Sequence, residues 1–370
     1  MNWADYLIPA NMRHKGINVY DGEPGFELPK TTKLVIIGVP EDRLSDGAGE
    51  IKSPGAIRKY LYSLSEGAQG TIVDMGNLKT GKTLVDTYYG VRDLVIEFSK
   101  RNIVTLIIGG TIDVFYGSCL AMKDTKGVLT NVTPTLKLPV RSSERHPLNS
   151  MILKKSDIPL HVCNVGYQSY YVAQEEIDYF QDRHFEAYRL GEVKTIILSE
   201  IEPVIRDSDL VALSLDAVKY SDAPAAANPS PNGFTGEEVC QLAFYAGLSH
   251  KCSSLGIFDM LPQNDMQDIT ANLAAQMAWY FIEGVKKRNI ENPKEHNQNF
   301  KKYLIYFDEL HHDLCFFKNI STERWWMEVP SISNESDSLI ISCTPEDYVR
   351  ATEQEIPERW WKTYQRINFE

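Results

Sequence analysis

Short apolar runs alternate with helical patterns along most of the chain. Such runs are typical of strands buried on both faces, and their alternation with helices predicts an α/β fold with a mainly parallel sheet in a three-layer α/β/α arrangement. The carboxyl ends of the strands should then carry the functional residues. The expected strands are 34–39, 71–74, 104–110, 161–166, 210–213 and 254–259, and the expected helices begin near 53, 84, 236 and 268.

The pattern changes from about Lys287 onward. A polar stretch, "KKRNIENPKEHNQNFKK", is followed by the strand-like pieces "YLIYF", "LCFFK", "RWWMEV" and "SLIISC" and by a tail, "IPERWWKTYQ". This order predicts a small antiparallel, β-rich addition. We therefore expect an α/β domain over residues 1–286 and a linker with a C-terminal extension over 287–370, packed on that domain.

Two tryptophan pairs in the extension call for an explanation of their own. Side chains of this size usually anchor a segment against the body of a protein, and an exposed stripe that binds a partner is the alternative. We expect burial against the α/β body for all four residues, which are Trp325, Trp326, Trp360 and Trp361.

Composition excludes some partners and favours one compartment. The 370 residues carry a net charge of −12, which argues against nucleic acid or an anionic membrane as the main partner. No apolar stretch approaches the length of a membrane span, and the first residues do not resemble a signal peptide. Six scattered cysteines without a CxxC pair are typical of reduced core thiols, so a cytoplasmic location is expected.

Four motifs occur in a fixed order. They are the "IIGVP" strand with its "SPGAIR" helix start, the strand that ends "LIIGG", the loop "SLDAVKYSDAPAAANPSPNGFTG", and "SLGIFDMLPQNDMQDITANLAAQ". In this order they resemble the ureohydrolase superfamily of arginase, agmatinase and, most closely, formimidoylglutamase, over roughly residues 30–286. The resemblance implies an arginase-like fold. It also implies two Mn²⁺ ions that bridge a hydroxide, which attacks a guanidinium or formimino carbon in relatives.

The residues at the implied metal-ligand positions do not suit those ions. Mn²⁺ takes carboxylate and imidazole ligands, and of the aligned positions that hold a metal in relatives, only Asp216 offers one. The late acidic residue that contacts substrate in arginases has Asp259 in its place. We therefore expect a vestigial site with no metal cofactor. The aligned residues are Thr111 and Ile112 in the first segment, Val132, Pro134 and Leu136 in the second, and Ser214, Asp216 and Lys219 in the third.

Lys219 has two interpretations. A buried carboxylate needs a partner once metals are gone, so Lys219 is expected to be the counter-ion of Asp216. A catalytic lysine with a lowered pKa is the alternative. Among the histidines, His311 and His312 should point to opposite sides of a strand, and His146 should be a surface or capping residue.

Three functions are consistent with these observations. The first is a non-catalytic pseudoenzyme that binds a partner protein or small ligand in the former active-site cleft. The second is a hydrolase of linear amidines with an altered metal site. The third is an architectural subunit of an oligomer, in which the extension modifies assembly. In each case Gly110, Ser214 and Asp259 should meet at one edge of the sheet.

Overall fold

The structure is a computed structural model. It describes residues 2–10, 16–23, 25–45, 49–65, 71–136, 160–195, 198–295, 297–307, 312–332 and 338–369.

The larger part of the chain is built on a mainly parallel sheet. Its strands are arranged in the order β1-β4-β3-β5-β10-β9-β6-β7-β8, with β2 also paired to β4, and β1 is its antiparallel member. The strands are β1 (Leu7–Ile8), β2 (Asn18–Val19), β3 (Leu34–Gly38), β4 (Ile72–Leu78), β5 (Val104–Ile108), β6 (Gly127–Val132), β7 (Leu160–Tyr167), β8 (Glu186–Arg189), β9 (Leu210–Ser214) and β10 (Ser254–Phe258).

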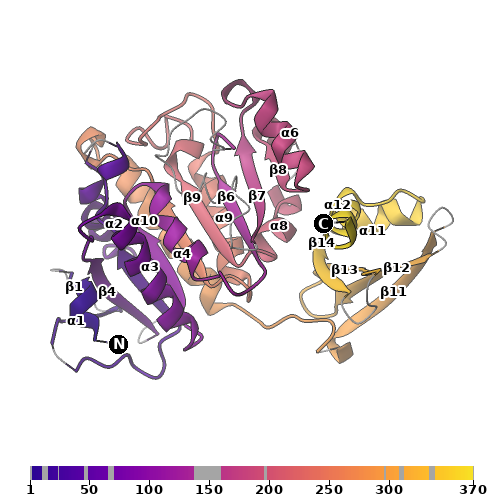
Figure 1. Ribbon diagram of the computed structural model, residues 1–370, viewed down its shortest axis with the longest axis horizontal. Coiled ribbons are helices and arrows are strands. Elements are labelled where there is room, and N and C mark those ends of the chain that lie inside the picture. The colour runs from indigo at the N-terminus through magenta and orange to yellow at the C-terminus, as the bar shows by residue number, and fades with distance from the viewer. Residues whose placement is uncertain are drawn as a thin grey trace.

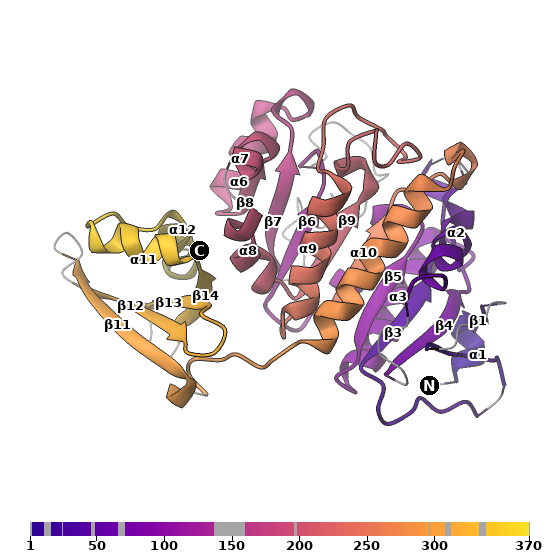
Figure 2. The ribbon, with the colours of Figure 1, turned by 180° about the vertical axis from the view of Figure 1, so that it is seen from behind.

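Helices cover both faces of this sheet (Figures 1 and 2). Consecutive residues of a strand point to opposite faces, and in β3 Leu34 and Ile36 belong to one hydrophobic core while Val35 and Ile37 belong to the other. The three-layer α/β/α fold is therefore confirmed. The first core is closed by α2 (Ser53–Leu61), α7 (Leu190–Thr195), α8 (Glu202–Arg206), α9 (Gly236–Leu248) and α10 (Ile269–Lys286), and the second by α1 (Trp3–Tyr6), α3 (Leu84–Ser99), α4 (Tyr116–Leu120) and α6 (Gln174–Asp182).

Side-chain caps fix where several helices begin. At α3 the Thr83 hydroxyl accepts from the backbone N–H of Asp86, whose carboxylate accepts in return from Thr83. Thr235 and Glu238 make the same reciprocal pair at α9. These capping boxes satisfy N–H groups that the first helical turn leaves without partners.

The C-terminal residues form a second, smaller unit. All four expected strands are present as an antiparallel sheet, and the tail is a helix packed on it (Figure 1). An extended segment after α10 joins this unit to the larger part. The elements are β11 (Phe300–Phe307), β12 (His312–Asn319), β13 (Trp325–Val329), β14 (Leu339–Cys343), α11 (Pro345–Thr352) and α12 (Glu358–Phe369).

The tryptophans differ from the expectation in where they are buried. Trp325 and Trp360 lie in a hydrophobic core of the C-terminal unit itself, together with residues such as Phe316. Trp326 is buried as well, whereas Trp361 is 39% exposed. The expectation that all four pack against the α/β body was therefore wrong, because the small sheet and its two helices enclose enough apolar surface to hold a core of their own.

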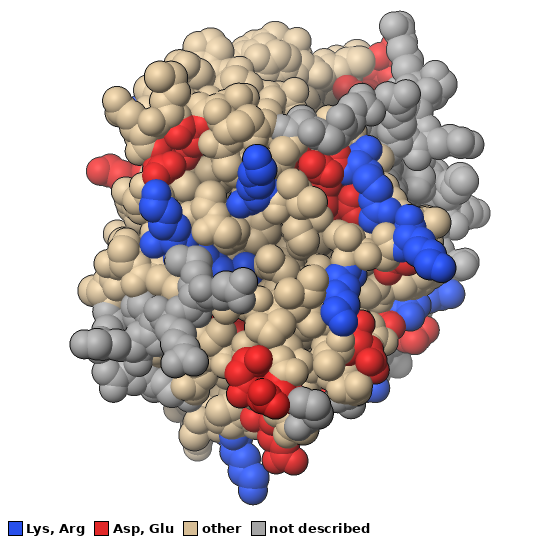
Figure 3. Space-filling view, turned by 90° about the vertical axis from the view of Figure 1, so that its left-hand side faces the viewer, with Lys and Arg blue, Asp and Glu red and all other residues tan. Residues whose placement is uncertain are grey.

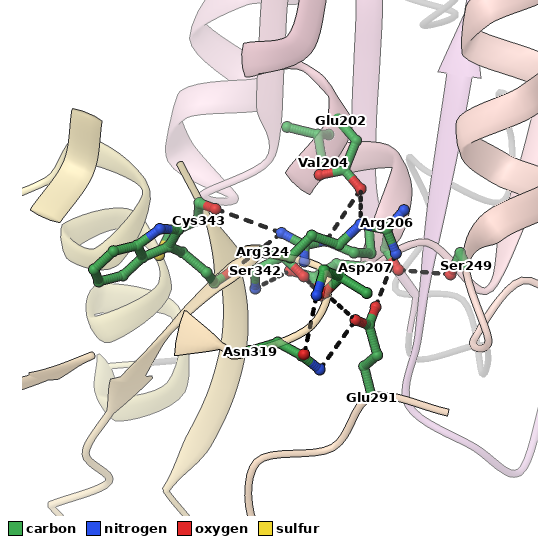
Figure 4. A network of polar contacts seen from close by, with 12 residues as sticks. Glu202, Val204, Arg206, Asp207, Ser249, Glu291, Asn319, Arg324, Ser342 and Cys343 are labelled. Atoms are coloured by element: carbon green, nitrogen blue, oxygen red, sulfur yellow. Dashed lines mark hydrogen bonds and ion pairs between the residues drawn. The ribbon is translucent and has the colours of Figure 1, made fainter. Parts of the chain in front are cut away.

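A buried carboxylate ties the two parts together (Figure 4). Asp207, which follows α8, accepts from the backbone N–H and the hydroxyl of Ser342, both at 2.8 Å, and lies 2.8 Å from Arg359 and 3.0 Å from Lys251. Burial alone would raise the pKa of Asp207, but the two cations and the Ser342 hydrogen bonds hold it far below its usual value. Asp207 is therefore ionised and satisfied by groups from both parts.

Arg206 extends the same contact. Its guanidinium lies 4.3 Å from the centre of the Trp326 ring, and its Nη2 donates to the carbonyl of Trp325 at 3.1 Å. A guanidinium over an indole face is a favourable cation–π geometry. Nearby, Arg324 pairs with Glu291 of the joining segment at 2.8 Å. Buried polar contacts thus orient the C-terminal unit against α8, and the domain boundary at 286 stays a prediction.

Charges of both signs are mixed on one face of the molecule. On the face formed by the N-terminal part, Lys and Arg side chains are interspersed with Asp and Glu (Figure 3). None of the described helices is long and apolar enough to cross a bilayer.

We predict that Arg359→Met lowers the free energy of unfolding by about 3–5 kcal/mol, because it leaves Asp207 and Glu186 buried without their shared cation. Arg350→Met is the matched control, since Arg350 is 51% exposed and 3.9 Å from Glu346, and its loss should cost about 0–1 kcal/mol. Denaturant unfolding followed by tryptophan fluorescence measures both. Equal effects of the two substitutions would contradict the role given to Arg359.

Candidate functional site

The carboxyl ends of three neighbouring strands meet at one point. In the sheet β10 lies between β5 and β9. Asp259, just after β10, donates its backbone N–H to the carbonyl of Gly110 at 3.0 Å and accepts from the hydroxyl of Ser214 at 2.5 Å. The expectation that Gly110, Ser214 and Asp259 share an edge is confirmed.

The Gly109-Gly110 pair makes the bend that brings β5 to this point. Both residues have positive φ, +84° and +79°, which favours glycine. A Cβ on Gly109 would lie 2.5 Å from the Pro54 ring, and one on Gly110 would lie 2.8 Å from the carbonyl oxygen of Val39. Side chains are therefore excluded here, and the chain turns directly into Thr111 and Ile112.

Thr111 and Ile112 offer no anionic ligand. The Thr111 hydroxyl is buried and has no hydrogen-bond partner among the residues that the structure describes, and the Ile112 side chain belongs to a hydrophobic core. The backbone N–H of Ile112 donates to Asp259 at 2.9 Å. This segment therefore contributes a structural hydrogen bond and apolar packing.

Hydrogen bonds of Asp259 connect the ends of neighbouring strands. One carboxylate oxygen accepts from Ile112 and the other from Ser214, while its carbonyl accepts from the backbone of Ala227 at 2.9 Å. Its φ is +65°, a conformation that aspartate adopts more readily than most residues. The residue at the place of the family's substrate-binding acid thus holds β5, β9 and the following loop together.

Asp216 closes the loop after β9. Its two oxygens accept from the backbone N–H of Asn228 at 2.7 Å and from the Asn228 side-chain amide at 2.9 Å. Its own N–H donates to the Ser214 hydroxyl at 3.2 Å. Sequence reasoning missed Asn228, although it lies in the quoted "AAANPSPNG" loop.

The expected pair between Asp216 and Lys219 is wrong. The Lys219 ammonium lies 3.5 Å from Asp222 and is 33% exposed. Its backbone N–H donates to the carbonyl of Phe234, and among the described residues its ion pair is with Asp222 and not with Asp216. Lys219 is therefore not a buried counter-ion, and it lines a surface pocket instead.

The second aligned segment follows β6. Val132, the last residue of β6, is level with Leu213 of β9. Val132 and Leu136 are buried apolar residues. Between them, Thr133 donates to the carbonyl of Thr135 and accepts from a neighbouring amide, both at 2.7 Å. The segment from 132 to 136 therefore contains no carboxylate or imidazole.

The structure reveals one further acid at this edge, Glu50. It is fully buried, accepts from the Ser45 hydroxyl at 2.6 Å on one oxygen, and has no partner for the other among the described residues. Burial raises the pKa of Glu50, and the negative charges of Asp259 and Asp42 raise it further. Glu50 sits in the "GEIKSPGAIR" motif, so its place before the helix start could have identified it.

These donors do not fit two manganese ions. Such a centre needs several carboxylates and imidazoles that converge on the two ions and have lone pairs available for coordination. The oxygens of Asp216 and Asp259 already accept hydrogen bonds from the protein, and the remaining positions carry Thr, Ile, Ser and Lys. The donors at the described positions therefore do not match the ligand set that the resemblance implies.

One other group of side chains has the spacing of a metal site. His161 and Cys163 of β7 and Glu186 of β8 have ligand atoms within 4.8 Å of one another. Arg359 already lies 3.5 Å from Glu186, and burial raises the pKa of the Cys163 thiol well above its usual value. We interpret the group as part of the surface on which α12 packs, because Arg359 of α12 already neutralises the Glu186 carboxylate.

A pocket of about 350 Å³ opens beside the edge. It lies between the ends of β7 and β8, α7 and the loop after β9, with Lys219 on its wall. Ligands of α/β proteins bind outside the carboxyl ends of the strands.

His146 and His311 lie outside the described residues, as does the side chain of His312.

We predict that Lys219→Met changes the free energy of unfolding by only about 0–1 kcal/mol, since its ion pair is exposed. Asp216→Ala should cost about 1–3 kcal/mol, because it leaves the N–H of Asn228 without its acceptor. In a double-mutant cycle the two effects should add. A recovery of stability in the double mutant would restore the counter-ion interpretation.

We predict that Glu50→Gln stabilises the protein at neutral pH. A carboxyl whose pKa is raised by folding is penalised when it ionises, so the penalty is absent below its usual pKa of about 4.3 and grows as pH rises above it. The stability gain of Glu50→Gln should therefore increase from pH 4 to pH 7 in thermal melts. Glu97→Gln, in α3, is the control for the loss of a carboxylate that is 22% exposed.

Comparison with known proteins agrees with the fold. Over 266 residues the chain is 25% identical to the formimidoylglutamase of Staphylococcus carnosus, covering 67% of this chain and 85% of that one. A formimidoylglutamase of Staphylococcus aureus is 25% identical over 304 residues, 74% of this chain and 94% of its own.

Solved structures are similar too. The crystal structure of Trypanosoma cruzi formiminoglutamase with Mn²⁺ superposes with a TM-score of 0.63 at 20% identity, covering 72% of this chain and 97% of that one. Formimidoylglutamase from Bacillus subtilis gives 0.62 at 18% identity, with 78% and 93% covered. The model of the Arginase family matches residues 32–283, more than half of the 370 residues, and the chain therefore belongs to the arginase family.

Proposed function

We propose that this arginase-family protein binds a small molecule at the carboxyl edge of its sheet without two-manganese hydrolysis. The observation that carries the proposal is the state of the two acids at the edge. Asp216 and Asp259 serve as hydrogen-bond acceptors that hold the strand ends and the loop together. A pocket with a lysine on its wall lies beside them. Binding of a small molecule needs such a pocket, whereas the family's two-manganese reaction needs carboxylates and imidazoles that are available to coordinate metal.

Hydrolysis of a linear amidine is the second candidate, and the relatives favour it more directly than they favour a binding role. The relatives named above are formimidoylglutamases. Glu50 and Asp259 also place two carboxyl groups at one edge, and the raised pKa of Glu50 is the property of a general acid. In this candidate Glu50 would donate a proton at its carboxyl oxygen.

Assembly and location enter as further proposals. An oligomer in which the C-terminal unit modifies contacts is compatible with either candidate, as is a protein partner at the edge. A cytoplasmic location is proposed from the six cysteines, all free and buried.

We predict that the purified chain takes up no stoichiometric manganese and releases no glutamate from N-formimidoylglutamate. The reason is the donor set, in which Asp216 and Asp259 already accept hydrogen bonds from the protein. Elemental analysis after incubation with Mn²⁺, followed by gel filtration, and an assay for released glutamate measure the two. The Staphylococcus carnosus relative, treated in parallel, is the positive control.

Turnover that Glu50→Gln abolishes, with the fold intact, would reject the binding proposal in favour of the hydrolase. Stoichiometric manganese that is lost in Asp216→Ala would do the same. Absence of both would reject the hydrolase.

A further inference from the structure

The pocket beside the edge is lined by cations and no acids. Arg189, Lys194 and Lys219 all contribute to its wall, and its described lining includes no aspartate or glutamate. The whole chain has 50 acidic and 38 basic residues. A cavity with three positive side chains in so acidic a protein therefore marks a place where negative charge is attracted.

The three cations come from separate elements and converge. Arg189 ends β8, Lys194 lies in α7, and Lys219 follows β9. In the described part of the chain each has an acidic neighbour at a long distance, 3.4 Å from Arg189 to Glu192, 3.5 Å from Lys194 to Glu238 and 3.5 Å from Lys219 to Asp222. Charge-assisted hydrogen bonds are about 2.7–2.9 Å long, so these contacts are loose. A lysine also has three N–H donors, which leaves donors for a ligand.

The neutral part of the wall is held in place by its own hydrogen bonds. Gln168 is buried, and its amide donates to the carbonyl of Asn232 at 3.2 Å. The Tyr170 hydroxyl donates to Gln168, and the Asn232 amide donates to that hydroxyl at 3.4 Å. The loop after β7 is thereby tied to the loop after β9. A wall that is already ordered loses less entropy when a ligand binds.

Gly233 explains how Lys219 reaches this wall. A Cβ on Gly233 would lie 2.4 Å from the backbone nitrogen of Lys219, so only glycine allows the two strands of the loop to approach. In that approach the N–H of Lys219 donates to the carbonyl of Phe234 at 3.0 Å. The backbone thus fixes the base of the Lys219 side chain at the pocket, where the arginase-family resemblance implies a metal-ligand position.

We infer that this pocket binds a small organic dianion, either a phosphate monoester or a dicarboxylate. Three cations from three elements match two negative charges better than one, because each existing acidic neighbour offsets part of the positive charge. A volume of about 350 Å³ is at the small end for ligand pockets and suits a compact molecule. The inference rests on the proposed binding function and names its ligand class.

The test is calorimetric titration of the full chain with glycerol 3-phosphate and, separately, with glutarate. Lys194→Gln and Lys219→Gln should each raise the Kd about tenfold, the loss of one charge-assisted contact, and the double substitution should raise it further. Lys219→Arg should keep most of the affinity. Binding should also weaken with added salt, because the side chains are partly exposed.

Arg101→Gln is the matched control. Arg101 is an exposed cation between α3 and β5, at the opposite edge of the sheet, and its loss should leave the Kd unchanged. Preference for glycerol 3-phosphate would identify a phosphate ligand, and preference for glutarate a dicarboxylate. The inference is overturned if neither probe binds at millimolar concentration, or if Arg101→Gln weakens binding as much as the pocket variants do. Manganese-dependent hydrolysis, by contrast, overturns the proposed function and is measured separately.

Discussion

The hydrogen bonds of Asp259 are the constraint on which the edge of the sheet depends. A carboxylate that is 4% exposed must be satisfied, and here the strand ends themselves satisfy it, through the N–H of Ile112 and the hydroxyl of Ser214. In a metal site such carboxylates would be satisfied by cations. The same requirement is met for Asp216 by Asn228. Both acids are therefore satisfied by hydrogen bonds from within the protein.

The positive charge of this region lies beside the edge and not within it. Lys219 faces the pocket, and β8 brings Arg189 to the same wall. Three residues before Arg189 in β8, Glu186 receives Arg359 from α12 at 3.5 Å. The C-terminal unit therefore contacts the strand that lines the pocket. Arg359 joins the contact with Asp207 to the contact with Glu186 of β8, so the two belong to one buried network. Removal of the C-terminal unit should therefore perturb the wall of the pocket.

The sequence predicts the fold well because the fold depends on patterns that repeat. Alternation of apolar residues in each strand, the Gly-Gly bend and the four strands after residue 300 are local signals, and each is present in the structure. The predicted pair between Asp216 and Lys219 failed because it depends on the directions of the two side chains. Asp216 and Lys219 are three residues apart, but a turn separates their side chains, and Asp222 is the nearer acid.

The tail shows a missed signal of another kind. In "ERWWKTYQ", Trp360 and Tyr364 are four residues apart, as on one face of a helix, and their rings stack at 5.0 Å between centroids. Polar partners are harder to foresee, because Asp207, Ser342 and Arg359 are far apart in the sequence and meet only after both units have folded.

The partners of the polar side chains at the carboxyl edge of the sheet are equally hard to foresee. A sheet core is fixed by many apolar positions, so relatives near 20% identity keep it, whereas the chemistry at the edge depends on a handful of side chains. Family membership therefore constrains the scaffold of this protein far more tightly than it constrains its reaction.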